Sequence, residues 1–192
     1  MPDPNPAALD FLLARRSRPA KTLVAPAPDR ATLETLLQAA MRSPDHGKLE
    51  PWRFIVLERP ALNRLADLAR ARGQALGVDP DRIAKVADQF GRAPLMIVVV
   101  SSPVASDKVP EVEQLYSAGA ASLQLLNAAL AAGWGANWLT GFAAHDRDFV
   151  ENGLGLAPRE SVAAFMVIGT ETRVPPERPR PDPASKVTWV ST

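Results

Sequence analysis

Apolar residues recur at helical spacing in several separate segments of the chain. Leu9, Leu12 and Leu13 predict a helix over residues 6–16, and Pro6 stands at its first position, where a proline is tolerated. The same spacing of three and four residues predicts further helices at residues 30–42, 60–76, 81–90, 111–132 and 146–152.

Three runs of apolar and β-branched residues predict strands at 52–57, 94–102 and 161–170. The run at 94–102, PLMIVVVSS, is typical of a central strand that is covered on both faces. A brief extended piece is expected at 137–140, and the tail either returns as an edge strand at 187–190 or leaves the protomer. Because strands and helices do not alternate as a βαβαβ repeat, the fold class is α+β or α/β.

The segment from Ser117 to Gly133 is apolar or small on nearly all sides, which predicts a buried helix. The small residues at 117–121 bring the backbone close to whatever lies against them. Tight packing on the sheet explains this pattern. The alternative is a subunit interface, or a flat cofactor lying against the same face.

The composition is that of an ordinary globular protein, with 192 residues, 46% hydrophobic and 22% charged. We expect a single domain over 1–192, in which the Pro/Arg-rich tail at 171–192 is a candidate for exchange with a partner subunit. The net charge of +1 gives no general attraction to nucleic acid or to a membrane, and we expect neither as a partner. An anion must therefore be bound by a local cluster.

The residue types exclude several kinds of site. There is no cysteine, which rules out disulfides, thiolate catalysis and cysteine-based metal or iron–sulfur sites, and with only two histidines we expect no metal site. The N-terminus does not resemble a signal peptide, and the apolar stretch at 117–133 is short for a membrane span and is interrupted by Gln124 and Asn127. We expect a cytoplasmic protein.

The motif RRSR at residues 15–18 closes the first predicted helix. Arg15, Arg16 and the hydroxyl of Ser17 combine fixed positive charge with a small donor, which is what a phosphate monoester needs. Two arginines in a last helical turn also complement the helix dipole, so the motif alone does not decide between the two roles.

His46 lies in the stretch SPDHGKLEPW, between two prolines and directly before a predicted core strand. Such a histidine either bonds within its own loop or faces a binding site. Arg42, one turn upstream, could present a second cation to the same place. A Ser-His-Asp hydrolase is not expected, because the chain has no G-x-S-x-G motif.

The glycines of GWGANWLTG (133–141) do not form a dinucleotide-binding fingerprint, because the spacing differs and the motif follows a helix instead of a strand. Gly133 and Gly135 would instead let the chain leave the helix and pass close to a flat ligand. Trp134 and Trp138 are core aromatics or parts of such a site.

Taken together, these segments resemble the nitroreductase family of flavoproteins, and most closely its short branch of NAD(P)H nitroreductases. The resembling stretches are RRSRPAK, AAMRSPDHGKLEPWRFIVLE, KVPEVEQLYSAGAASLQLLNAALAAGWGANWLTG, VAAFMVIGT and the Pro/Arg-rich tail. They occur in the family's order and cover the chain nearly from end to end. The resemblance implies a mixed sheet flanked by helices, in an intertwined homodimer with two FMN molecules at the subunit interface.

The resemblance also implies the binding residues. FMN contacts fall in three groups: Arg15, Arg16 and Ser17; Arg42 and His46; and Trp138, Leu139 and Thr140. The first group would hold the phosphate and the polar edge of the flavin, and the second would come partly from the other subunit. Nicotinamide-nucleotide contacts are implied at the end of the long helix, at Ala128, Ala129, Leu130, Ala131, Ala132 and Gly133.

One position departs from the family pattern, because Leu139 stands where relatives often carry arginine. A backbone contact would survive this change, whereas a side-chain contact to the flavin or to a nucleotide phosphate would be lost. Arg178 or Arg180 in the tail could supply a replacement charge, but we assign neither of them to the site.

The resemblance implies that FMN carries the chemistry and that no side chain is catalytic. NADH or NADPH would reduce the flavin and leave, and a nitroaromatic or quinone-like acceptor would then take its place, in a ping-pong cycle. Two alternatives stay open. One is the same flavin fold with another redox reaction, such as dehydrogenation or enone reduction, and the other is a non-catalytic flavin-binding dimer.

Overall fold

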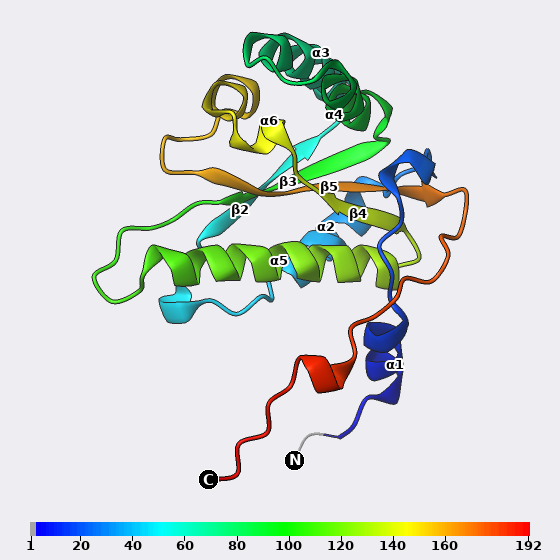
Figure 1. The fold of residues 1–192 in the computed structure, drawn as a ribbon, viewed down its shortest axis with the longest axis vertical. Helices are drawn as coiled ribbons and strands as arrows, with labels where there is room; N and C mark the ends of the chain where they lie inside the picture. Colours follow the sequence, from blue (N-terminus) through cyan, green and yellow to red (C-terminus); the bar gives the residue numbers. More distant parts are fainter. Residues whose placement is uncertain (1–2) are drawn as a thin grey trace.

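A computed structural model describes residues 3–192 as a β-sheet between two layers of helices, which confirms the α+β class (Figure 1). The strands are β1 (Leu23–Val24), β2 (Trp52–Leu57), β3 (Leu95–Ser101), β4 (Gly135–Leu139) and β5 (Ser161–Glu171). They follow the order β1-β5-β3-β2, and β4 also pairs with β5. The long strand β5 is therefore the one on which the rest of the sheet is assembled.

The helices are α1 (Pro6–Ala14), α2 (Arg30–Ala40), α3 (Arg59–Ala75), α4 (Pro80–Arg92), α5 (Glu111–Ala131) and α6 (Phe142–His145). Figure 1 shows α3, α4 and α6 on one face of the sheet, and α2 and α5 on the other. Side-chain caps set three of the helix starts. Asn5 accepts from Ala8 N–H before α1, Asp29 accepts from Thr32 N–H before α2, and Asp79 accepts from Arg82 N–H before α4.

Strand β3 is buried along its whole length because both of its faces are covered. Met96, Val98 and Val100 pack with α3 and α4 in one apolar cluster, whose members include Leu62 and Phe90. The alternate residues Leu95, Ile97 and Val99 belong to a second cluster with Leu33 of α2 and Leu125 of α5. This explains why the sequence of β3 is apolar without alternation.

Two glycines let β1, β4 and β5 approach closely near the end of the sheet. Gly135 and Gly169 lie opposite each other in the β4–β5 pair. A Cβ atom on Gly169 would lie 2.4 Å from Pro94 Cγ and 2.8 Å from the carbonyl oxygen of Val24. A Cβ atom on Gly135 would lie 2.4 Å from Leu23 Cδ2, so the absence of a side chain there lets β4, which carries residues of the candidate site, lie close to β1.

One expectation needs correction. Every strand pair within residues 3–192 is antiparallel, so the sheet of one chain is not mixed. Residues 187–190 form no strand within the described chain and Trp189 is 91% exposed, which leaves the alternative that the tail leaves the protomer. The helix expected at 146–152 is present over residues 147–154, with a π-helical stretch at Phe149–Gly153, and it begins after Asp146, whose side chain accepts a bond from Phe149 N–H.

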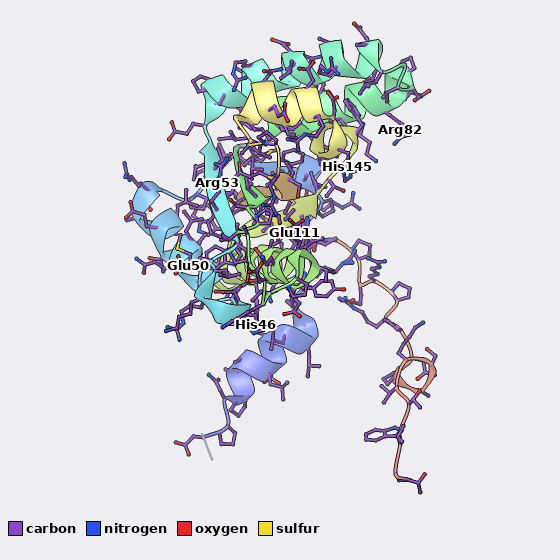
Figure 2. All side chains as sticks on the ribbon, turned by 90° about the vertical axis from the view of Figure 1, so that its left-hand side faces the viewer. His46, Glu50, Arg53, Arg82, Glu111 and His145 are labelled. Atoms are coloured by element: carbon purple, nitrogen blue, oxygen red, sulfur yellow. The ribbon has the colours of Figure 1, made fainter. Side chains whose placement is uncertain are left out.

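Both ends of the described chain project away from the helical layers (Figures 1 and 2). Helix α1 has no buried residue, and Leu9, Leu12 and Leu13 are each more than half exposed. The tail beyond β5 is exposed nearly throughout and contains only a short turn at Pro183–Ser185. Among residues 3–192, no helix combines the length and apolar character that crossing a membrane requires.

Candidate functional site

The RRSR segment is held in place by the end of α1 and by strand β4. Helix α1 ends where the N–H of Arg15 donates to the carbonyl of Phe11, and the chain then continues in an extended conformation. Arg18 N–H donates to the carbonyl of Ala136 at 2.8 Å, and the side-chain amide of Asn137 donates to the carbonyl of Arg18 at 2.6 Å. These bonds fix the backbone that carries the two arginines of the motif.

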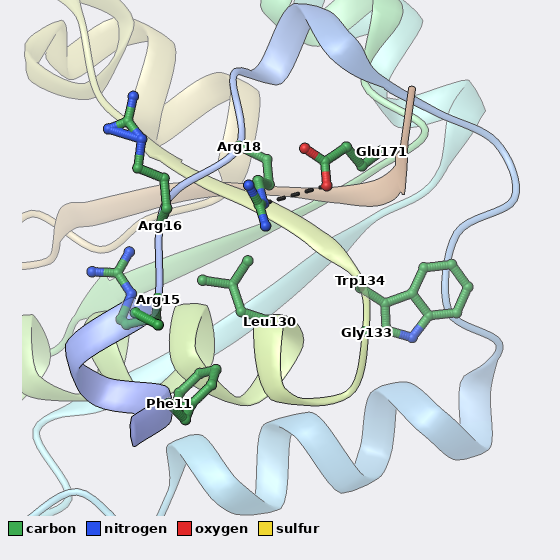
Figure 3. Close-up of a pocket in the computed structure, with 9 residues that line it drawn as sticks. Phe11, Arg15, Arg16, Arg18, Leu130, Gly133, Trp134 and Glu171 are labelled. Carbon is green, nitrogen blue, oxygen red and sulfur yellow. Dashed lines mark ion pairs between the residues drawn. The ribbon is translucent and has the colours of Figure 1, made fainter. Parts of the chain in front are cut away.

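Arginine side chains from this segment line a first cavity of about 290 Å³, at the C-terminal end of α5 (Figure 3). Arg18 forms an ion pair with Glu171 at 3.4 Å, which compensates its charge. The residues that line this first cavity are Phe11, Ala14, Arg15, Arg16, Arg18, Leu130, Gly133, Trp134 and Glu171.

The first cavity contains positive charge that the chain does not compensate. Arg15 donates to Ser17 Oγ at 3.2 Å, but the buried Nε atoms of Arg15 and Arg16 have no hydrogen-bond partner among the described residues. Burial lowers the pKa of Arg15, and the nearby charges of Arg180 and Arg16 lower it further. A doubly charged oxyanion such as a phosphate would satisfy these donors and remove the repulsion.

Arg180 is a member of this group that the sequence analysis left unassigned. It lies in the tail, 165 positions after Arg15 in the chain, and forms an ion pair with Glu177 at 3.0 Å. No local pattern around PERPRP indicates that the tail returns to the end of α1. Its approach to Arg15 is therefore visible only in three dimensions.

A second cavity, of about 610 Å³, lies next to the first along the same segment. Arg18 lines the first cavity and Pro19 the second, while on β4 Asn137 and Leu139 line the second. The complete lining of the second cavity is Pro19, Ala20, Lys21, Lys85, Asp88, Gln89, Arg92, Ala93, Asn137 and Leu139. Consecutive parts of one segment thus line the two cavities, residues 15, 16 and 18 the first and residues 19–21 the second.

The predicted contacts at the end of β4 face in different directions. Leu139 packs with the α3–α4 cluster and lines the second cavity. Trp138, its neighbour in the strand, points to the other face of the sheet, and its indole N–H donates to the carbonyl of Ala163 at 3.1 Å. Thr140 is exposed and precedes Gly141, whose φ of 134° is accessible to glycine and rarely to other residues.

Arg42 and His46 lie at the other end of α5. His46 Nδ1 lies 2.8 Å from Glu113 Oε2 on the first turns of α5, and both Arg42 and His46 are exposed. Figure 2 shows His46 on the loop that precedes β2. Ser117 of α5 donates to the carbonyl of Pro44 at 2.8 Å and so anchors this loop to the helix.

A single chain therefore does not bring the two groups of predicted contacts together. The RRSR cavity is lined by Leu130, whereas His46 contacts Glu113, 17 positions earlier in the same helix. At 1.5 Å per residue these positions are about 25 Å apart along the axis. If both groups contact one FMN, the second group must come from another copy of the chain.

The predicted nicotinamide-nucleotide segment lies at the end of α5. Leu130 and Gly133 line the first cavity, and Ala129 is buried against the sheet. The segment offers no side-chain hydrogen-bonding group, so any ligand contact here would use apolar surface or the backbone. Within residues 3–192, no three carboxylate or histidine side chains gather in a way that could hold a metal ion.

The family model described as "Nitroreductase family" matches residues 12–170 of this chain. The chain is 35% identical over 183 residues to the Escherichia coli (strain K12) protein named "Putative NAD(P)H nitroreductase YdjA", with 95% of this chain and 98% of that protein covered. It is 39% identical over 165 residues to a Haemophilus influenzae protein named "Putative NAD(P)H nitroreductase", with coverages of 85% and 88%.

A solved structure from Desulfovibrio desulfuricans, described as a putative nitroreductase in complex with FMN, has the same fold. Its TM-score is 0.74 at 23% identity, and the superposition covers 99% of both chains. The match to the family model includes the RRSR segment, the His46 loop and every residue that lines the second cavity. The resemblance noted in the sequence is confirmed, and this chain belongs to the nitroreductase family of oxidoreductases.

Proposed function

We propose that this protein is a cytoplasmic FMN-dependent oxidoreductase that passes reducing equivalents from NADH or NADPH to nitroaromatic or quinone-like acceptors. The observation that carries the proposal is the pair of arginines in the first cavity, whose buried nitrogen atoms have no partner among the described residues. A phosphate would complete this site. The names of two relatives include NAD(P)H and a structural neighbour binds FMN, which supports a phosphorylated flavin as the ligand.

The two adjacent cavities suit the two ends of FMN. Arg15, Arg16 and Ser17 would hold the phosphate in the first cavity, with Arg180 adding charge from the tail. The ring would lie toward the second cavity, against Leu139 and the backbone at Thr140. This assignment is consistent with the chemistry of each lining, because the first has unsatisfied donors and the second has mainly apolar walls.

Bound FMN supplies the redox chemistry, and the protein binds it, orients it and excludes water. Asp88 is the one carboxylate among the residues that line the second cavity, and it is paired with Arg92 at 2.9 Å. No lining carboxylate is therefore free to act as a dedicated proton donor, and solvent would provide protons. At about 610 Å³ the second cavity suits one small molecule beside the ring, which favours a ping-pong cycle in which donor and acceptor alternate.

We further propose that the complete site forms in a homodimer. The exposed side of α5 carries Val112, Leu115, Tyr116 and Leu123, each at least 45% exposed, with open space around Gly119 between them. A continuous apolar stripe on a helix is typical of an interface. A second copy that covers this stripe would bring its Arg42 and His46 toward the FMN that the first chain holds.

The first test is the cofactor itself. We expect the purified protein to retain FMN through gel filtration, and its absorbance near the flavin band to bleach when NADH or NADPH is added without oxygen. A nitroaromatic or quinone added afterwards should restore the band. A protein that neither carries nor takes up FMN would contradict the proposed function, and one whose flavin is not bleached would leave only flavin binding.

The second test separates shared sites from sites within one chain. Heterodimers are prepared from one Arg15→Met chain and one His46→Ala chain, after each homodimeric variant has been found to lose FMN. If each FMN contacts Arg15 of one chain and His46 of the other, one of the two sites is fully wild type and one FMN per dimer is retained. If both contacts come from the same chain, neither site is intact and the heterodimer is empty.

A further inference from the structure

The second cavity has an apolar floor and a charged rim. Half-buried or buried residues form the floor, among them Pro19, Ala93 and Leu139, and exposed lysines from η1 (Ala20–Thr22) and from α4, Lys21 and Lys85, stand at the rim. On β4, Leu139 occupies a position where an arginine would place charge, and Asn137 donates its side-chain amide to the carbonyl of Arg18, so the wall formed by β4 carries no charge. Positive charge is thus present at the opening and absent from the wall.

The charges at the rim do not cancel. Arg92 and Asp88, one helical turn apart on α4, form an ion pair at 2.9 Å. No ion pair within residues 3–192 involves Lys21 or Lys85. The rim therefore has an excess of two positive charges beside a mainly apolar cavity of about 610 Å³.

We propose that this cavity selects electron acceptors that are flat and carry an anionic substituent, such as a carboxylate on a nitroaromatic or quinone ring. The inference rests on the proposed function, because it places the acceptor beside the flavin ring. The apolar floor suits the ring of the acceptor, and Lys21 and Lys85 attract its anionic group at the opening. Both lysines are specificity-determining residues, and neither acts on the reacting atoms.

Two other roles for the lysines would leave different signatures. If they bound the phosphates of the nicotinamide nucleotide, their removal would slow reduction of the flavin by NADPH. If they acted on the flavin, their removal would shift its midpoint potential and change turnover of all acceptors alike. Only a role in selecting an anionic acceptor changes the ratio of kcat/KM for a charged acceptor to kcat/KM for its neutral analogue.

The experiment compares 4-nitrobenzoate with 4-nitrobenzamide, which differ in charge at nearly equal size. For the wild-type holoprotein we expect kcat/KM to favour the benzoate by about tenfold at low salt, and the preference to shrink as ionic strength rises. Lys21→Met and Lys85→Met should each lower the benzoate-to-amide ratio by about threefold to fivefold, the scale of an exposed ion pair. Lys108→Met, which removes an exposed lysine outside the cavity, should leave the ratio unchanged.

Four measurements together make the result decisive. An unchanged ratio in both lysine variants, or a wild-type preference for the amide, would overturn the proposal. The rate of flavin reduction by NADPH and the flavin midpoint potential, measured on the same variants, would identify the alternative role. Ligand-observed NMR measures equilibrium binding of the two nitro compounds. 4-Nitrobenzoate must bind more tightly than 4-nitrobenzamide even if no turnover occurs. The inference can therefore fail or survive independently of the proposed reaction.

Discussion

Arg15 and Arg53 are both half-buried arginines, but their neighbours differ completely. Arg53 on β2 donates from Nε and Nη2 to the two carboxylate oxygens of Glu160, each at 2.7 Å. These bonds raise the pKa of Arg53 and lower the pKa of Glu160 to about 2. Arg15 has Arg16 and Arg180 nearby in place of a carboxylate, and burial together with their repulsion lowers its pKa.

The difference separates arginines that serve the fold from arginines that serve a ligand. Arg72 belongs with Arg53, because it donates to both oxygens of Asp146 at 2.7 and 3.0 Å. In these pairs the chain supplies the counter-charge itself. At Arg15 it supplies a hydroxyl and two more arginines, of which Arg180 is paired with Glu177, and no carboxylate bonds to Arg15 itself, so this arrangement favours the binding of an anion. Variants of the two kinds should therefore separate stability from cofactor retention.

The largest effect on stability is expected for Arg53→Met. The carboxylate of Glu160 is nearly buried, and without Arg53 it would keep the N–H of Ala157 as a partner but lose its counter-charge. Losing one partner of a buried pair costs several kcal/mol, and because Arg53 is partly exposed we expect about 2–3 kcal/mol at pH 7. Urea unfolding measures this loss, while the FMN content per folded protein should not change.

Arg30→Met provides a matched control for this prediction, because Arg30 pairs with Glu34 on the open surface of α2. Its removal should leave the unfolding midpoint where it is in the wild type. A wild-type midpoint for Arg53→Met as well would mean that the Arg53–Glu160 pair is energetically neutral. The contrast between arginines that serve the fold and arginines that serve a ligand would then not hold for stability.

The same pair makes stability depend on pH in a defined window. The pKa of Glu160 is lowered from 4.5 to about 2 in the folded chain, so its ionised form is stabilised by folding. This contribution is complete above pH 4.5 and is lost as the pH falls toward 2. The stability difference between the wild type and Arg53→Met, measured by urea unfolding, should thus shrink across this interval, and a constant difference would contradict the assignment.

The sequence predicted the elements whose pattern is local. The continuous apolar run of β3, the bounds of β2 and the start of the helix at Arg30 depend on burial and capping within a few residues. The mixed sheet was predicted incorrectly, because the relative direction of strands depends on how distant segments of the chain meet. The helix expected at 146–152 is present, and only its π-helical hydrogen bonding at Phe149–Gly153 was not predicted.

Only part of the candidate site could be predicted from the sequence. The motif RRSR indicated an anion site, and the structure places Arg15 and Arg16 together in one cavity. The approach of Arg180 joins segments more than 160 residues apart, and no local pattern encodes it. The separation of His46 from that cavity also follows from the length of α5 in three dimensions and not from any motif.

After the loss of stability in Arg53→Met, the next largest effect is a loss of FMN binding, and it is expected for Arg15→Met. Removing a charge-assisted hydrogen bond to a phosphate should weaken FMN binding roughly tenfold to a hundredfold. Because the folded state disfavours the charged form of Arg15, stability without FMN should stay the same or rise slightly. Fluorescence titration with FMN and urea unfolding of the apoprotein measure the two quantities. A variant that unfolds more easily but retains FMN would place Arg15 with the structural arginines.

The smallest effect is expected for Arg180→Ala, and it tests how the arginines share the ligand. Arg180 is half exposed and already paired with Glu177, so its attraction for a phosphate is screened and its removal should weaken FMN binding by a few-fold at most. The loss should disappear at high ionic strength, whereas the loss in Arg15→Met should persist because that side chain is less accessible to solvent. If Arg180→Ala weakened FMN binding as strongly as Arg15→Met at every salt concentration, the tail would be an essential wall of the site, and the anion would bind between the tail and the end of α1.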